Sequence, residues 1–245
     1  MTGHNVKISP QVYARTGGLL YLIIIVTGIF GEAFVRNKLI VLGDATATAN
    51  NIMASQLLWR IGIAGDLIAH VCDLPLMLIF YVLLRPVNKN LALLAVFFCL
   101  IQTAVLVAAK LNLFTVLFLL ESGDYLKAFE PHQLHALMYL SIKADGYGFG
   151  LGLIFFGFEC LILGYLIFRS GYLPKALGIL MPIAGLSYLT NSFAMILAPK
   201  FADLIFPTIM IPAFIAESSF CLWLIVKGVN VPEWEKQAGI GAGRG

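Results

Sequence analysis

Four acidic residues stand inside the long apolar segments of this chain of 245 residues, namely Asp66, Asp73, Glu159 and Glu217. An ionised carboxylate in the hydrocarbon interior of a bilayer costs several kcal/mol unless it is paired, protonated or hydrated. Carboxyl groups in such surroundings bind protons more tightly than they do in water, so they can exchange them near physiological pH. These residues therefore predict a polar cavity that binds a small molecule or moves protons or ions.

Three ionisable residues share one face of the second apolar segment. Asp66, His70 and Asp73 follow one another at the i, i+4 and i+7 spacing of a helix, which places them within about 60° of each other. Pro75 follows, and its ring is expected to remove the hydrogen bond to the Val71 carbonyl and to kink the helix. A free carbonyl beside buried polar groups could bind water or a ligand, and His70 could join a proton relay.

The carboxyls of Asp73, Glu159 and Glu217 are predicted to lie at one depth in the membrane. Each stands ten to twelve residues before a basic residue at the end of its segment. At ~1.5 Å per residue, that places them ~15–18 Å from these anchors, near the middle of the bilayer. The spacing that Glu159 and Glu217 share reflects either such anchoring or an internal repeat. Equal depth is necessary for the three acids to meet, but it does not show that their helices face one another.

Lys110 in the third segment is predicted to lie at the depth of Asp66, about 27–28 Å from the side of the basic anchors. The sequence therefore favours an ion pair between the two, with the alternative that Lys110 extends to the outer headgroups. Asn191 in the fifth segment either bonds to a neighbouring helix or lines a cavity. A second ion pair is expected near the outer surface, between Glu32 and Arg60.

Composition and segment length identify the class of protein that must position these side chains. Hydrophobic residues make up 60% of the chain and charged residues 12%, whereas about a quarter of a soluble domain is charged. Segments of about 20 apolar residues cross a bilayer as helices. We expect an all-α membrane protein, a six-transmembrane-helix bundle whose partner is the lipid bilayer. The expected spans are 16–36, 57–84, 91–120, 147–168, 177–198 and 204–226.

The distribution of basic residues predicts the orientation of the bundle. Nine of the sixteen Lys and Arg residues lie in the two tails and in the two short loops on the same side. The positive-inside rule places that side, and both termini, in the cytoplasm, so we expect a multi-pass membrane protein with cytoplasmic ends. The expected parts are a cytoplasmic N-terminal tail (1–15), a single transmembrane domain (16–227) and a flexible cytoplasmic C-terminal tail (228–245). We expect no signal peptide, because the first fifteen residues are polar.

Two outer segments and one span carry signals for irregular structure. Residues 44–55 predict a short helix with Asp44 as its N-cap. Residues 131–145 predict a second short helix, which lies at the outer interface or extends the fourth span outward. Pro207 and Pro212 predict a bent or broken sixth helix, a feature found where transporters bind ligands.

The remaining motifs favour packing over chemistry. Gly148 and Gly152 share a helical face with Glu159 and predict close contact with a neighbouring helix. The four cysteines stand in apolar segments without C-x-x-C spacing, so neither a disulfide framework nor a zinc ribbon is predicted. We expect no cofactor and no bound metal, and beyond the inner anchors there is no basic patch that would bind nucleic acid. The sequence is silent on the oligomeric state.

Three stretches resemble a known family. They are residues 15–32, residues 81–92 and residues 39–52, the last with the run Gly-Asp-Ala-Thr-Ala-Thr-Ala-Asn-Asn at 43–51. Together they are similar to an integral-membrane family of bacteria called domain of unknown function 4386, and the resemblance extends over nearly the whole chain, to about residue 198. It implies a polytopic bacterial membrane protein and no particular activity.

Three hypotheses for function follow. In the first, the acidic residues line a cavity that binds a small molecule or takes part in transport of protons or ions. In the second, the buried charges only pair with one another and fix the register of the helices in a structural or accessory protein. In the third, His70 and the acids hold a metal in an intramembrane enzyme. The chain has one intramembrane histidine, which argues against a zinc site of three histidines but leaves a carboxylate-rich site open.

Overall fold

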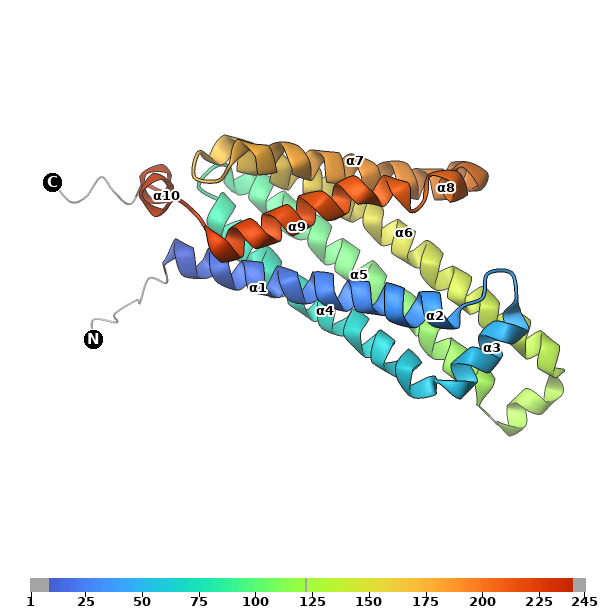
Figure 1. The fold of residues 1–245 in the computed structure, drawn as a ribbon. Coiled ribbons are helices and arrows are strands. Elements are labelled where there is room, and N and C mark those ends of the chain that lie inside the picture. Colours follow the sequence, from blue (N-terminus) through green and yellow to red (C-terminus); the bar gives the residue numbers. More distant parts are fainter. Residues whose placement is uncertain (1–8, 122, 240–245) are drawn as a thin grey trace, which may run out of the picture.

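The computed structural model of this protein describes residues 9–121 and 123–239, and these residues are helical, without a β-strand (Figure 1). Six helical segments of the described chain are long and apolar enough to cross a membrane. The prediction of an all-α bundle with six spans is therefore confirmed. The spans are Pro10–Leu39, which begins with α1 (Pro10–Ile29), then α4 (Gln56–Leu84), α5 (Lys89–Leu120), α6 (Pro131–Ser170), α7 (Lys175–Leu197) and Thr208–Val226, which contains α9 (Ile211–Val226).

Shorter helices complete the described chain. They are the π-helix η1 (Phe30–Arg36) and α2 (Asn37–Leu39), which continue α1, then α3 (Ala45–Ala54), the 3-10 helices η2 (Asp124–Ala128) and η3 (Thr208–Met210), α8 (Pro199–Ile205) and α10 (Val231–Gln237). The predicted N-cap of α3 is confirmed, because Asp44 Oδ1 accepts a hydrogen bond from the Ala47 backbone N–H at 2.8 Å. Residues 131–145 belong to α6, so they extend the fourth span and do not form a separate interfacial helix.

The sixth span begins later than the sequence predicted. Residues 204–205 belong to α8, and the chain turns at Phe206 and Pro207 before η3 and α9 carry it across the membrane. The prolines explain the break, since Pro207 stands between two helices and Pro212 occupies the first turn of α9, where its missing N–H costs no helical hydrogen bond. The predicted broken helix is thus confirmed, and its predicted start at residue 204 is wrong.

The six spans form a closed ring (Figure 1). Each span packs against its neighbours along the chain, and α9 returns to pack against α1, whereas α4 and α6 make little contact across the ring. Where the ring closes, the Gln11 side chain donates to the Lys227 carbonyl at 2.9 Å and accepts from the Val229 N–H at 3.0 Å. The described chain therefore starts and finishes at one end of the bundle. We call this the termini end, and the end that carries α3, η2 and α8 the far end.

Glycines allow neighbouring helices of the ring to approach closely. A Cβ atom on Gly18 of α1 would lie 2.8 Å from the backbone nitrogen of Ile225 in α9. On α6, a Cβ atom on Gly148 or Gly152 would lie 2.6 Å from side-chain atoms of α5. The predicted packing role of Gly148 and Gly152 is confirmed. In membranes, small residues let helix backbones approach closely, and the dispersion contacts that result hold the helices together.

The residues after the last span differ from the expected flexible tail. Within the predicted flexible tail (228–245), Val231–Gln237 form the helix α10. Trp234 of α10 and Tyr172 of the α6–α7 loop both donate to the Leu83 carbonyl, at 2.9 and 2.6 Å. Burial raises the pKa of Tyr172 above its ordinary value, so this phenol keeps the proton that it donates. Residues 240–245, and residues 1–8 of the predicted N-terminal tail, lie outside the described residues.

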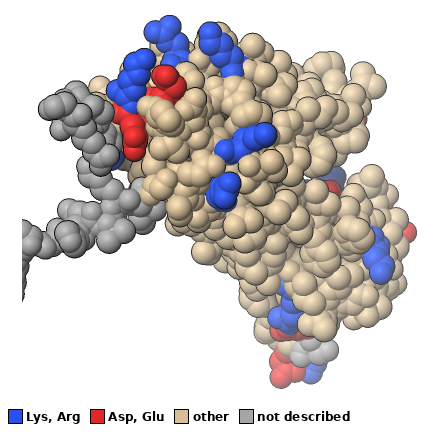
Figure 2. Space-filling model, turned by 60° about the vertical axis from the view of Figure 1, so that its left-hand side comes forward, with Lys and Arg blue, Asp and Glu red and all other residues tan. Residues whose placement is uncertain are grey.

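Uncharged residues cover most of the surface of the ring. Figure 2 shows a broad uncharged area between charged groups at the two ends of the molecule. Large apolar side chains of the spans, such as Leu57, Val71 and Leu111, are more than two-thirds exposed. Because backbone polar groups are satisfied within helices and the outward side chains are apolar, this surface contacts lipid.

Replacing Gly178 by alanine should destabilise the bundle. A Cβ atom on Gly178 of α7 would lie 2.5 Å from the backbone nitrogen of Phe168 in α6, and backbone cannot move aside as a side chain can. We expect the free energy of unfolding in detergent to fall by about 1–3 kcal/mol. The matched control is Gly65→Ala on α4, where the nearest atom to the new methyl group is 3.9 Å away. Equal stability of the two variants would contradict the packing described for α6 and α7.

Candidate functional site

The ring of spans encloses a cavity of about 680 Å³. Residues from all six spans line it, together with residues of α8 and η3. All seven side chains that the sequence singled out are among them, namely Asp66, His70, Asp73, Lys110, Glu159, Asn191 and Glu217. The second, fourth and sixth spans therefore face one another, which equal depth alone did not establish.

The two ends of the cavity differ. Toward the far end its lining includes exposed residues of α1, η1 and α8, with Glu32 and Asp203 among them. Figure 2 shows a hollow at the right of the view with charged atoms set back inside it. Toward the termini end, three buried rings pack together, with centroid distances of 6.2 Å for Tyr21–Phe80, 6.3 Å for Tyr21–Phe220 and 5.2 Å for Phe80–Phe220. The cavity is thus accessible from the far end and backed by packed side chains at the other.

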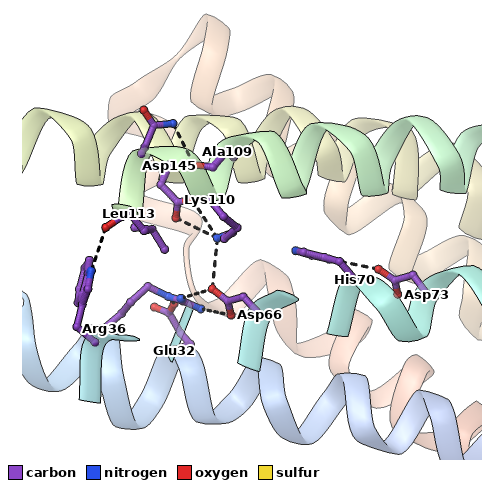
Figure 3. A network of polar contacts seen from close by, with 11 residues as sticks. Glu32, Arg36, Asp66, His70, Asp73, Ala109, Lys110, Leu113 and Asp145 are labelled. Atoms are coloured by element: carbon purple, nitrogen blue, oxygen red, sulfur yellow. Dashed lines mark hydrogen bonds and ion pairs between the residues drawn. The ribbon is translucent and has the colours of Figure 1, made fainter. Parts of the chain in front are cut away.

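A network of buried ion pairs lies in the half of the cavity toward the far end (Figure 3). Asp66 of α4 accepts from Arg36 Nη1 at 2.8 Å and lies 3.4 Å from Lys110 Nζ. Lys110 also lies 2.9 Å from Asp145 Oδ1 of α6. We call Arg36, Asp66, Lys110 and Asp145 the Asp66 network. The predicted Asp66–Lys110 pair is confirmed, and Lys110, with 5% of its side chain exposed, does not extend to the headgroups.

The local structure of the first span positions Arg36. The widened turns of η1 bring Arg36 over Asp66, and π-helical turns of this kind are frequent at functional sites. Gly31 leaves the room for this contact, since a Cβ atom there would lie 2.8 Å from Asp66 Oδ1 and 2.9 Å from Arg36 Nη2. Arg36 Nε also donates to Glu32 Oε2 at 2.8 Å, one turn earlier on the same helix.

The expected ion pair between Glu32 and Arg60 is wrong. Glu32 pairs with Arg36, and Arg60 pairs at 3.2 Å with Glu121, the residue that follows α5. Counting residues along a span gives the depth of a side chain, but it does not give the direction in which the side chain points. Glu32 and Arg36 are four residues apart on one continuous helix, and that spacing was the signal in the sequence that identifies the observed pair.

The other half of the cavity holds the remaining acids, Asp73, Glu159 and Glu217, which we call the acid layer. His70 Nδ1 and Asp73 Oδ2 are 3.3 Å apart on α4, and the tautomer of the imidazole decides which is the donor (Figure 3). The Tyr188 hydroxyl of α7 donates a hydrogen bond to Glu217 Oε1. Two of the three acids therefore have a neutral or titratable partner from the protein.

Glu159 differs from the other acids. Its side chain is buried, with 4% of the residue exposed, and its Oε2 has no hydrogen-bond partner within the described chain. The polar residue Asn191 of α7 lines the same cavity, and its Oδ1 also lacks a partner among the described residues. Asn191 Nδ2 has only a weak acceptor, the Met195 sulfur at 3.6 Å. Native proteins rarely leave buried polar atoms unsatisfied, so these two oxygens are available as hydrogen-bond acceptors beside the cavity.

Comparison with known proteins identifies the family. The family model described as "Domain of unknown function (DUF4386)" matches residues 16–228. The chain belongs to this family. A relative of it is an uncharacterized protein of Archaeoglobus fulgidus, 29% identical over 171 residues that cover 70% of this chain and 86% of that protein. No solved structure matches the chain.

The family resemblance offers no chemistry for the cavity, so its residues must be interpreted from their own contacts. The sequence analysis did not identify Arg36 and Asp145 as members of a buried network. It also did not identify Gln102 and Tyr188 as cavity residues. Gln102 is a buried amide on α5, eight residues before Lys110, and helical spacing places the two close to one face. Within the described residues, no group of three or more His, Cys, Asp or Glu side chains is placed to hold a metal ion.

Removing Lys110 should destabilise the protein strongly, because Asp145 would keep its charge without a partner. We expect Lys110→Met to cost about 3–5 kcal/mol of unfolding free energy in detergent. The double variant Lys110→Met with Asp145→Asn should recover a large part of that loss, since it removes both charges. The matched control is Arg60→Gln, which breaks a pair whose side chains are about half exposed, 49% and 51%; it should cost less than about 1 kcal/mol. If Lys110→Met costs no more than this control, the network does not stabilise the fold.

Proposed function

We propose that this member of the family is a multi-pass membrane protein that binds a small organic molecule in its central cavity. We further propose that binding is coupled to proton exchange at Glu159, as in proton-linked transport. The site comprises the seven lining residues Asp66, His70, Asp73, Lys110, Glu159, Asn191 and Glu217.

The observation that carries this proposal is the Glu159 carboxyl, which is buried beside the cavity and whose Oε2 has no hydrogen-bond partner among the described residues. A carboxylate in such a place is costly unless a proton or a cation neutralises it. Pairing within the protein accounts for Asp66 and Asp145, so the structural hypothesis has support in the Asp66 network. The structural hypothesis gives no role to Glu159, which has no such pairing. The contrast between paired and unpaired acids therefore favours a cavity that binds a ligand.

The shape of the cavity supports entry of the ligand from the far end. Glu32, Asp203 and their exposed neighbours line that end, whereas Tyr21, Phe80 and Phe220 pack at the other. Passage across the membrane would require these rings to separate, which is a rearrangement at the contacts of α1, α4 and α9. The Gln11 contacts that hold α1 to the end of α9 lie on the same side.

The basic residues support an orientation with the termini end in the cytoplasm. The short loops at that end contain Arg85, Lys89 and Lys175, and the positive-inside rule applies to such loops. We therefore propose that both tails, 1–15 and 228–245, are cytoplasmic, that 16–227 is a single transmembrane domain, and that the membrane is the bacterial inner membrane.

Modification of Cys99 tests whether small molecules enter the cavity. Cys99 lines it, whereas Cys160, on α6, is fully buried and is not part of the lining. We expect the neutral reagent methyl methanethiosulfonate to modify Cys99 of the purified protein at least about tenfold faster than Cys160, because diffusion into a water-filled cavity requires no unfolding. Peptide mapping by mass spectrometry gives both rates from one sample. If Cys99 reacts only after denaturation, the cavity is closed to solutes and the proposal fails.

Infrared spectroscopy tests the proton at Glu159. A protonated carboxyl absorbs apart from a carboxylate, so we expect an absorption of protonated carboxyl at neutral pH that loses the component of one residue in Glu159→Gln. The control Glu121→Gln removes an acid with half of its side chain exposed at the far end and should leave the absorption unchanged. A spectrum that is the same for the protein and for Glu159→Gln would contradict proton binding at this residue.

A further inference from the structure

We infer that the ligand of the cavity is an amphiphilic organic cation, whose positive charge lies at the acid layer and whose apolar body lies against the aromatic and methionine walls. This inference rests on the proposed function, because it names the class of molecule that the same cavity would bind.

The charges around the cavity are compensated in one half only. Among the lining residues that the structure describes, the basic side chains are Arg36, His70 and Lys110. Arg36 and Lys110 are engaged with Asp66 and Asp145, and His70 is next to Asp73. Glu159 and Glu217 therefore receive no cation from these groups, so a cationic ligand would supply the charge that the protein does not.

The walls beside the acid layer suit the apolar part of such a ligand. Tyr21, Phe80, Phe156 and Tyr188 line the cavity, and the rings of Phe156 and Tyr188 lie 5.2 Å apart next to Glu217. Aromatic faces attract cations and offer apolar area at the same time. The lining also contains Met77, Met181, Met195 and Met210, and flexible thioether side chains adapt to ligands of different shape.

The size of the cavity favours an organic molecule over a bare ion. Its volume of about 680 Å³ is in the range of sites that enclose drug-sized ligands, about 300–1,000 Å³. A metal ion would need several converging ligands, and no such group is found in the described residues. An organic anion of the same size would find no unpaired basic side chain among the described lining residues, so the acid layer selects against it.

Binding of the cation would exchange it for a proton. In the empty cavity Glu159 holds a proton; when the cation enters, the O–H bond breaks, the proton leaves to solvent and the carboxylate faces the cation. The total charge in the cavity then stays constant. Affinity should rise with pH as long as the empty form is protonated, by at most about tenfold per pH unit for one proton.

The reactivity of Cys99 toward reagents of different charge tests this inference. The probes are methyl methanethiosulfonate, its cationic trimethylammonium-ethyl analogue and its anionic sulfonatoethyl analogue. Each rate at Cys99 is divided by the rate of the same reagent with a free thiol in solution, which removes differences in intrinsic reactivity. We expect the cationic reagent to be favoured over the anionic one by at least about tenfold, because two or three fixed carboxyls act with opposite sign on the two probes.

Two variants separate the acid layer from general surface charge. Glu159→Gln should lower the ratio of cationic to anionic rates by at least about threefold, whereas Glu121→Gln should leave it unchanged, since Glu121 is a surface residue outside the lining. The apolar requirement is tested by protection: tetraphenylphosphonium should slow modification of Cys99 by the neutral reagent at lower concentration than tetramethylammonium does. This protection should strengthen as pH rises.

The outcomes distinguish this inference from the function on which it rests. If the neutral reagent does not reach Cys99 in the folded protein, the proposed function fails. If it reaches Cys99 but the anionic reagent reacts as fast as the cationic one, the cavity is accessible and the inference of a cationic ligand is overturned. The comparison of the three reagents uses the unsubstituted protein. It therefore tests the inference even if the Glu159→Gln variant does not fold. Equal protection by the two cations would overturn the amphiphilic part alone.

Discussion

A lysine and two aspartates are buried, beside a partly buried arginine, where four helical segments of the bundle meet, and the cost of removing these charges from water limits how the helices can be arranged. Asp66 accepts from Arg36 and lies beside Lys110, which in turn contacts Asp145. A rotation of η1, α4, α5 or α6 away from this point would leave a charge alone in a medium of low dielectric constant. The contacts thus fix the register of four segments, and the packing elsewhere must be compatible with it.

The ring arrangement follows from where small and large side chains are placed. Glycines on the perimeter, such as Gly18 and Gly178, let adjacent helices touch almost backbone to backbone. Helices on opposite sides of the ring, such as α4 and α6, make little contact, and the space between them is the cavity. Polar side chains that point inward therefore face one another across a cavity. Water can solvate their charges there, and a proton or a ligand of opposite charge can neutralise them.

The two halves of the cavity differ in how the desolvation cost of their buried charges is offset. In the Asp66 network, side chains of opposite charge from the protein lie against one another. In the acid layer, Glu217 accepts from a tyrosine and Glu159 has no partner for Oε2 among the described residues. We propose a structural role for the first and a ligand-binding role for the second, so substitutions in the two halves should differ in whether they change stability or charge selectivity.

The sequence by itself determined the features that depend on one helix at a time. The length of the apolar segments predicted the six spans, and Asp44 was predicted as the N-cap of α3. The equal depth of Asp66 and Lys110 predicted their ion pair. Arg36 and Asp145 were missed and Glu32 was assigned the wrong partner, because these contacts depend on the rotation of each helix about its axis relative to its neighbours. Only the tertiary structure decided that rotation, the closure of α9 on α1 and the meeting of the acids around one cavity. The physical reason is that periodicity relates side chains along a single helix, whereas their directions across the bundle are set by packing between helices.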